Sequence, residues 1–236
     1  MKHQVLVYPS ILSGDFGRLA EEAKRIEKAG ADAIHIDIMD GHFVPNLTLG
    51  PRAVEAINRA TDLFLDVHLM MYNPYDYIET FVRAGADRIT FHFEATEDIE
   101  ETIGFIRRCG IQAGLAFRPE TSFDMIPKYL TQCDLILLMT VSPGFGGQKF
   151  MPEVEEKIRL VREFCDKHGI RQGGIAAKSG IDPKMLAPFN IQVDGGINQE
   201  TAKQCIQAGA NVLVSGNYLY HHEDFAKAIH SLRHHQ

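Results

Sequence analysis

The sequence predicts an α/β protein that folds as a single-domain (β/α)8 TIM barrel. Two observations support this prediction. Short apolar segments alternate with longer amphipathic ones along the 236 residues, and the alternation occurs eight times, at about 30 residues per unit. Glycine-containing junctions also recur where a helix would end and the next strand begin. Such a barrel places its active site at the carboxyl ends of its strands.

Eight strands are expected where the apolar segments are short and lie between turn signals. They are predicted at residues 5–8, 33–38, 64–69, 88–92, 112–117, 135–139, 191–193 and 212–215. Amphipathic helices are expected to fill the intervals between them. Parallel strands covered by helices are buried on both faces, which is why these segments are apolar rather than strictly alternating.

Three junctions between a helix and the next strand share nearly the same letters. Residues 29–32, 84–87 and 208–211 each read Ala-Gly-Ala followed by Asp or Asn, and residues 109–111 are a looser fourth copy. Each copy places Gly just past a helix end, where a left-handed residue is needed before the next strand. The repetition therefore supports repeated βα units.

One stretch breaks the alternation. Residues 170–187 are too long and irregular for an ordinary helix-to-strand connection, which usually takes a few residues. We predict a surface insertion within the single domain 1–236. Connections that precede a strand lie at the barrel end opposite the site, so no catalytic role is expected for it.

Composition and charge exclude several classes of function. The net charge is −7, which disfavours binding to nucleic acid or to an anionic membrane. No apolar run approaches the length of about 20 residues that spans a bilayer, and the N-terminal segment lacks a secretory cleavage pattern. The four cysteines are scattered singly, which predicts reduced thiols and a cytoplasmic location. They are Cys109, Cys133, Cys165 and Cys205.

Four potential metal ligands occur at or near the ends of predicted strands. His35 and Asp37 are two residues apart, so their side chains leave the same face of one strand. His68 and Asp194 end two other strands. Two imidazoles and two carboxylates suit one divalent ion, Zn²⁺, Fe²⁺, Mn²⁺ or Co²⁺, better than Mg²⁺ or Ca²⁺, and they leave the choice among the four open.

Glycine-rich turns follow the sixth, seventh and eighth predicted strands. Glycines let backbone N–H groups approach an anion closely, and barrels of this class commonly bind phosphate at these turns. One pair of glycines is weak evidence, but three consecutive turns favour a phosphate site. The candidate phosphate-binding residues are Gly144, Phe145, Gly146, Gly147, Gly195, Gly196, Gly216 and Asn217.

Longer motifs give these residues a family context. Residues 9–16, 35–46, 66–70, 141–148 and 193–196 closely resemble segments of the ribulose-phosphate 3-epimerase (pentose-5-phosphate 3-epimerase) family, and they extend from the first strand to the seventh. The resemblance implies a barrel of the ribulose-phosphate-binding type. It also implies an isomerase that interconverts D-ribulose 5-phosphate and D-xylulose 5-phosphate in the pentose phosphate pathway.

The resemblance assigns roles to the candidate residues. His35, Asp37, His68 and Asp194 would bind the metal, and Ser10 and His68 would contact the ketopentose phosphate. Asp37 and Asp194 would exchange a proton at C3 from opposite sides, through an enediolate whose charge the metal stabilises. The pocket walls would be Met39, Met70 and Met139. One residue departs from the family pattern, since Asn217 stands where a serine is usual.

Other polar residues near these strand ends remain outside the catalytic set. Asp66 is expected either to orient a ligand or to make a structural hydrogen bond. Asp40 and His42 are expected to shape a loop, and His92 and Glu94 to face the mouth of the barrel.

Two alternative functions remain open from the sequence. An allulose-6-phosphate 3-epimerase would use the same metal and aspartates, and a noncatalytic phosphosugar-binding barrel would share the fold. The oligomeric state is also left open, and a homo-oligomer is allowed.

Overall fold

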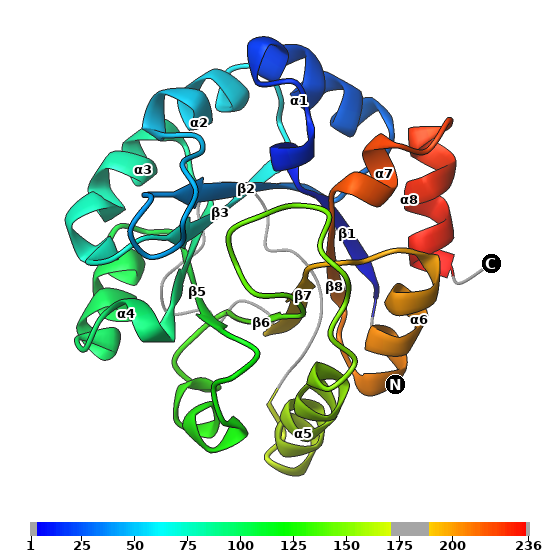
Figure 1. The fold of residues 1–236 in the computed structure, drawn as a ribbon. Helices are drawn as coiled ribbons and strands as arrows, with labels where there is room; N and C mark the ends of the chain where they lie inside the picture. The colour runs from blue at the N-terminus through cyan, green and yellow to red at the C-terminus, as the bar shows by residue number, and fades with distance from the viewer. Residues whose placement is uncertain (1–3, 171–188, 235–236) are drawn as a thin grey trace.

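Eight parallel strands form a barrel with helices around it (Figure 1). The computed structural model describes residues 4–170 and 189–234. The strands are β1 (Leu6–Pro9), β2 (Ala33–Met39), β3 (Phe64–Met70), β4 (Arg88–His92), β5 (Gln112–Phe117), β6 (Leu135–Met139), β7 (Asn190–Asp194) and β8 (Val212–Ser215). The predicted strands are confirmed, with shifts of at most one residue at their ends.

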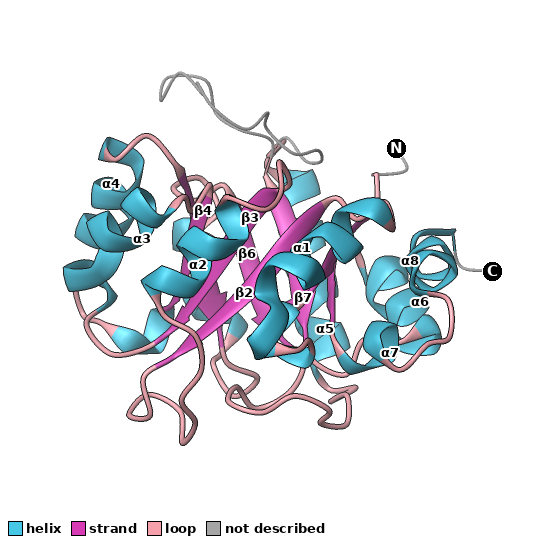
Figure 2. Cartoon of the chain, turned by 90° about the horizontal axis from the view of Figure 1, so that it is seen from above, coloured by secondary structure: helices cyan, strands magenta, loops and turns pink. Residues whose placement is uncertain are grey.

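The outer helices complete the barrel, and the loops that follow the strands gather at one end of it (Figure 2). The helices are α1 (Leu19–Lys28), α2 (Pro51–Asn58), α3 (Ile78–Ala84), α4 (Ile99–Arg108), α5 (Val154–Lys167), α6 (Gln199–Ala208), α7 (Asn217–Tyr220) and α8 (Phe225–His234). None of these described helices is long and apolar enough to cross a bilayer.

The connection between β5 and β6 differs from the expected helix. It contains two short 3₁₀ turns, Phe123–Met125 and Pro127–Tyr129, and no α-helix. Pro127 has no N–H group to donate, and Pro119 disfavours helical backbone in the residue before it. The expectation that amphipathic helices fill every interval was therefore wrong at this one.

The apolar core lies between the barrel and its helices. Ile34 and Ile36 of β2 point outward and belong to the same buried cluster as Ile26 of α1 and Val54 of α2. The alternate residues His35 and Asp37 therefore point into the barrel, as the spacing of two predicted. The strand thus separates packing on one face from chemistry on the other.

Hydrogen-bonded pairing is continuous around the barrel except between β1 and β2. The strand order runs β1-β8-β7-β6-β5-β4-β3-β2, so these two strands stand at its ends. In the described part of the chain they share one β-bridge, Ser10 to His35, and a backbone hydrogen bond from Asp32 to the Val7 carbonyl (3.2 Å). The barrel therefore has a thinly paired seam.

A polar residue before each even-numbered strand repeats one hydrogen-bonding pattern. Asp32 accepts a hydrogen bond from the Val7 N–H at 2.8 Å, and Asp134 accepts from the Ala113 N–H at 2.8 Å. Asp87 and Asn211 do the same for the Leu65 and Ile191 N–H groups. These side chains satisfy backbone donors where odd-numbered strands begin.

The repeated Ala-Gly-Ala junctions thus end in residues with a structural task. The glycines have the predicted left-handed backbone, with φ of 78° at Gly30, 104° at Gly85 and 120° at Gly209, and the looser copy has 82° at Gly110. The predicted insertion at 170–187 lies, apart from its first residue, outside the described residues.

Candidate active site

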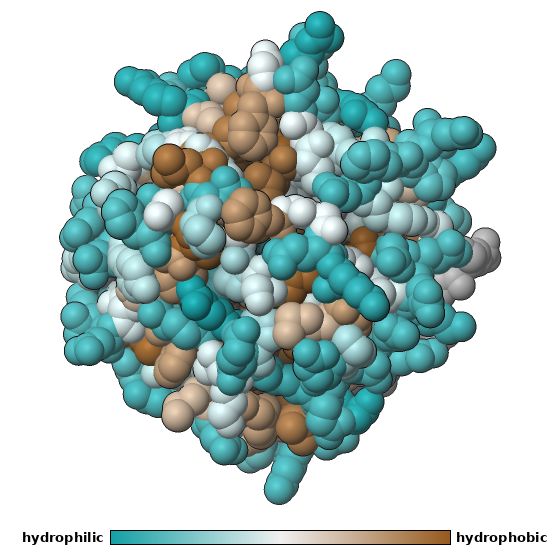
Figure 3. Space-filling model, in the orientation of Figure 1, coloured by the Kyte–Doolittle hydropathy of each residue, from teal (hydrophilic) through white to brown (hydrophobic). Residues whose placement is uncertain are grey.

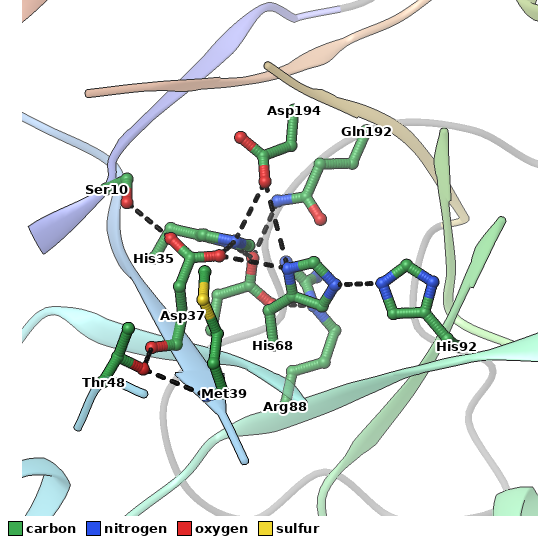
Figure 4. A network of polar contacts seen from close by, with 11 residues as sticks. Ser10, His35, Asp37, Met39, Thr48, His68, Arg88, His92, Gln192 and Asp194 are labelled. Carbon is green, nitrogen blue, oxygen red and sulfur yellow. Dashed lines mark hydrogen bonds and ion pairs between the residues drawn. The ribbon is translucent and has the colours of Figure 1, made fainter. Parts of the chain in front are cut away.

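Four side chains from three strands converge inside the carboxyl end of the barrel (Figure 4). His35 and Asp37 come from β2, His68 from β3 and Asp194 from β7. Asp37 Oδ1 lies 3.2 Å from both His35 Nε2 and His68 Nδ1. Asp194 Oδ2 lies 3.8 Å from the first nitrogen and 3.9 Å from the second. The structure therefore brings together all four ligands expected from the sequence.

The donor set fits a divalent metal ion. One ligand atom from each of the four residues lies within 4.8 Å of the others. His35 Nε2 is buried and has no hydrogen-bond partner among the described residues, although a carboxylate oxygen lies beside it. A buried nitrogen without a hydrogen-bond partner is costly, whereas metal coordination would satisfy it.

His35 is held in place from behind by a buried charged group. Its Nδ1 lies 2.8 Å from Asp66 Oδ2, which also accepts a hydrogen bond from Gln192 at 2.7 Å. Asp66 Oδ1 accepts from Arg88 Nε at 2.8 Å, with both side chains almost fully buried. Burial alone would raise the pKa of Asp66, but Arg88 and His35 hold it well below its usual range. Asp66 thus has the orienting contact with His35 that was one of its two expected roles.

The two candidate acid-base carboxylates have opposite pKa shifts. Burial alone would raise the pKa of Asp37, but the adjacent His35 and His68 lower it well below its usual range. Burial, followed by the charge of Asp37, raises the pKa of Asp194 to about 7. The Ser10 hydroxyl donates to Asp37 Oδ2 at 2.6 Å. The protein groups alone therefore favour one carboxylate with a proton and one without.

A pocket of about 540 Å³ opens over this cluster. Ser10, Asp37 and Asp194 line it, whereas His35 and His68 are fully buried and do not. The three methionines and the glycine-rich turns expected from the sequence all line the same pocket: Met39, Met70, Met139, Gly144, Phe145, Gly146, Gly147, Gly195, Gly196, Gly216 and Asn217.

The turn after β7 can only be built from glycine. Gly196 has φ of 65°, and a Cβ atom there would lie 2.6 Å from the backbone nitrogen of Phe150. The turn therefore packs directly against the end of the glycine-rich loop that follows β6. The Asn217 side chain also contacts that loop. Its Nδ2 lies so close to Gly147 that a Cβ atom there would clash with it. Its Oδ1 accepts from the Ser13 hydroxyl at 2.8 Å.

The rim of the pocket is partly apolar. Figure 3, which views this end of the barrel, shows hydrophobic residues grouped over the loops that follow the strands. Leu47, Tyr72 and Phe145 are exposed there, on the loops after β2, β3 and β6. Asn46 Nδ2 donates to the Gly144 carbonyl at 2.7 Å and joins two of these loops.

Sequence reasoning left out of the site a third buried histidine, which contacts the cluster. His92 Nε2 lies 2.9 Å from His68 Nε2, and Glu94 Oε2 lies 3.2 Å from His92 Nδ1. Burial lowers the pKa of His92 to about 4. The place of His92 at the end of β4 was recognised, but the expectation that it faces the mouth of the barrel was wrong, because its side chain is fully buried against His68 and does not line the pocket. Asp40, as expected, shapes its loop by accepting from backbone N–H groups of His42 and Phe43.

The family of the chain follows from comparison with known sequences. A profile described as the ribulose-phosphate 3 epimerase family matches residues 6–220. The chain belongs to the ribulose-phosphate 3-epimerase family. The matched region contains every ligand and pocket residue described above, so the family assignment and the geometry concern the same site. The expectation of an isomerase is confirmed.

Known ribulose-phosphate 3-epimerases are similar along nearly their whole length. The protein of that name from Chlamydia pneumoniae is 51% identical over 228 residues, covering 96% of this chain and 93% of its own. The Bacillus subtilis protein of the same name is 47% identical, covering 97% and 98%. A tryptophan synthase α-subunit mutant from Pyrococcus furiosus has a TM-score of 0.68 with 14% identity over 98% of both chains, which shows the fold alone.

Proposed function

We propose that the chain interconverts D-ribulose 5-phosphate and D-xylulose 5-phosphate by two-base proton transfer at C3. The observation that carries this proposal is geometric: Asp37 of β2 and Asp194 of β7 both line the pocket and both reach one potential metal site. Two carboxyl groups that reach the same reacting centre from different strands suit the roles of base and acid. The names of the similar proteins supply the substrate.

Each aspartate would act on one face of the C3 carbon. Asp37 is on β2 and Asp194 on β7, so each approaches the pocket from its own strand. We assign one to removing the C3 proton and the other to returning a proton on the opposite face, with the order set by the substrate. Ser10 orients Asp37 through its hydrogen bond to Oδ2 and faces the substrate in the pocket.

His35, Asp37, His68 and Asp194 would hold the metal ion, either Zn²⁺, Fe²⁺, Mn²⁺ or Co²⁺. When bound, such an ion supplies a Lewis acid that polarises the C2 carbonyl and stabilises the charge of the enediolate. The protein residues orient the sugar and exclude water around it. Met39, Met70 and Met139 would form the apolar wall at the reacting carbon.

The phosphate would lie at the three glycine-rich turns. Gly144, Phe145, Gly146 and Gly147 form one turn, and Gly195 with Gly196 and Gly216 with Asn217 form the others. Their backbone N–H groups can donate to phosphate oxygens. The free thiols of Cys109, Cys133, Cys165 and Cys205 support a cytoplasmic location, where such thiols stay reduced.

The decisive experiment is NMR of ribulose 5-phosphate in deuterated water with the purified protein. We expect xylulose 5-phosphate with deuterium at C3, loss of the reaction after chelation, and recovery when a divalent metal is added back. Turnover of allulose 6-phosphate is measured in parallel. Faster turnover of this hexulose phosphate would show that it, and not ribulose 5-phosphate, is the preferred substrate. Binding of the sugar phosphate without deuterium exchange in any metal would refute catalysis.

A further inference from the structure

His92 and Glu94 lie at the carboxyl end of β4 and have no part in the proposed proton transfer. His92 is fully buried and does not line the pocket. The Glu94 side chain is 21% exposed. A buried imidazole beside a candidate metal ligand would reduce the stability of the fold if its nitrogens had no hydrogen-bond partners.

The two residues extend from His68 in one line of hydrogen bonds. His68 Nε2 contacts His92 Nε2 at 2.9 Å, and His92 Nδ1 contacts Glu94 Oε2 at 3.2 Å (Figure 4 shows the first contact). The other carboxylate oxygen, Glu94 Oε1, accepts from the backbone N–H of Arg118 at 2.9 Å and from the Thr121 hydroxyl. Arg118 is anchored in turn by its bond to the Phe43 carbonyl at 3.0 Å.

These contacts fix where the protons lie. Glu94 Oε1 receives two donors. Burial alone would raise the pKa of this carboxyl, but its hydrogen bonds lower it, so Glu94 is a carboxylate and Oε2 is an acceptor. His92 must then donate from Nδ1 and accept at Nε2. The proton shared by the two imidazoles therefore belongs to His68 Nε2. His68 Nδ1 is left with a lone pair and lies 3.2 Å from Asp37 Oδ1. Without a metal ion two acceptors face one another there, whereas a cation between them would satisfy both.

We propose that His92 and Glu94 are positioning residues that hold the His68 ring and keep its Nδ1 free of a proton, so that this nitrogen can bind the metal. The inference rests on the metal site of the proposed function. The two histidine ligands would then be oriented by different groups, His35 by the Asp66 carboxylate and His68 by the His92 imidazole. Loss of such outer partners typically weakens metal affinity about 10- to 100-fold.

Glu94→Gln is the sharpest test because it keeps the size of the side chain. Arg118 N–H and the Thr121 hydroxyl still require an acceptor, so the amide oxygen takes the Oε1 place and the NH₂ group faces His92. His92 must then accept at Nδ1 and donate from Nε2, which places the His68 proton on Nδ1. The tautomers of both histidines are read by ¹⁵N NMR of the metal-free protein, and Zn²⁺ affinity by competition with a chromophoric chelator.

We expect Glu94→Gln to reverse both tautomers and to weaken Zn²⁺ binding about 10- to 100-fold, with the melting temperature nearly unchanged. Thr121→Val is the matched control, since it removes one bond to the same carboxylate but keeps Oε2 an acceptor; its tautomers should match the unmodified protein. Unchanged tautomers and Zn²⁺ affinity in Glu94→Gln would overturn the proposal. If the unmodified protein binds no Zn²⁺, the metal site fails, while the tautomers still decide whether Glu94 sets the proton on His68.

Discussion

Asn46 donates a hydrogen bond from Nδ2 to the carbonyl oxygen of Gly144 at 2.7 Å, although 98 residues separate the two. This contact joins the loop after β2, which follows the metal-ligand strand, to the glycine-rich turn after β6, which we assign to the phosphate. The two ends of a sugar phosphate would therefore meet loops that are fixed relative to one another.

Asn46→Ala should raise KM for ribulose 5-phosphate about five- to tenfold and change kcat less, because a hydrogen bond of about 1 kcal/mol no longer holds the phosphate turn in place. Steady-state kinetics with metal-saturated protein measures both constants. His42→Ala is a control on the same loop, since among the residues that the structure describes its ring hydrogen-bonds only to the nearby Asp40 carbonyl. Equal effects of the two changes would contradict the prediction.

Asp37→Asn and Asp194→Asn should each lower kcat by about 10³-fold or more, since each removes one proton-transfer group. With two bases, each epimer is deprotonated by a different aspartate. For a given starting sugar, one variant should lose deuterium exchange at C3 and the other should keep exchange without epimerisation, and the order should reverse with the other sugar. Metal content is measured in parallel, and exposed Asp98→Asn serves as the control.

If both variants, loaded with metal, lose exchange equally with both sugars, the two-base assignment is wrong. Substantial epimerisation by either variant would contradict it as well. Circular dichroism separates these outcomes from a failure to fold.

Metal affinity should rise with pH. Asp194 has a pKa raised to about 7, so below that pH a metal ion must displace its proton. Burial alone would lower the pKa of His35, but Asp37 and Asp66 together raise it, and this adds to the dependence. Zn²⁺ affinity should therefore increase at least about tenfold per pH unit below 7. Calorimetry in two buffers counts the protons released, and a pH-independent affinity would contradict the expectation.

Gly146 should tolerate a small side chain but not a large one. A Cβ atom there would lie 3.6 Å from Asn217 Oδ1, which is ordinary contact, yet a longer side chain would enter the pocket beside the phosphate turn. Gly146→Leu should weaken substrate binding more than tenfold, whereas Gly146→Ala should change it less. Gly104→Ala in α4, away from the pocket, is the control. Unchanged affinity in Gly146→Leu would remove this turn from the phosphate site.

Asp134 offers a test of stability rather than activity. Asp134→Ala would leave the Ala113 N–H without its acceptor, so the free energy of unfolding should fall by about 1–3 kcal/mol. Asp134→Asn should lower the free energy of unfolding by less, because the amide oxygen of Asn211 accepts the equivalent backbone hydrogen bond from Ile191. Urea unfolding measures both. Equal losses would show that the charge, which also pairs with Arg107, matters more than the acceptor.

Periodicity was sufficient to predict the barrel and to place the ligands. His35 and Asp37 are two residues apart on a strand, and the carboxyl ends of parallel strands meet at one end of a barrel, so His68 and Asp194 could be grouped with them. The 3₁₀ turns between β5 and β6 were missed because local proline effects act against an otherwise regular alternation.

The contacts of His92, the third buried histidine, could not be predicted from local patterns. His92 Nε2 meets His68 Nε2 because the tilt and register of β3 and β4 place them together, and no spacing along one strand encodes that. Asp134 was missed for a different reason. Residues 132–133 before it are Gln-Cys rather than Gly-Ala, so only the shared hydrogen bond reveals it as a member of the repeated set.

The thin seam between β1 and β2 would give a metal ion bound at the candidate site a mechanical role. Within the described ranges, one bridge there pairs Ser10 with His35, and His35 is itself a candidate ligand. An ion held by β2, β3 and β7 would connect strands from both sides of this gap in the hydrogen-bonding ladder, as a non-covalent cross-link does. Chelation would then loosen the wall of the barrel as well as stop turnover, and amide hydrogens at Val7 and Asp32 would exchange with solvent sooner than those of β4 and β5.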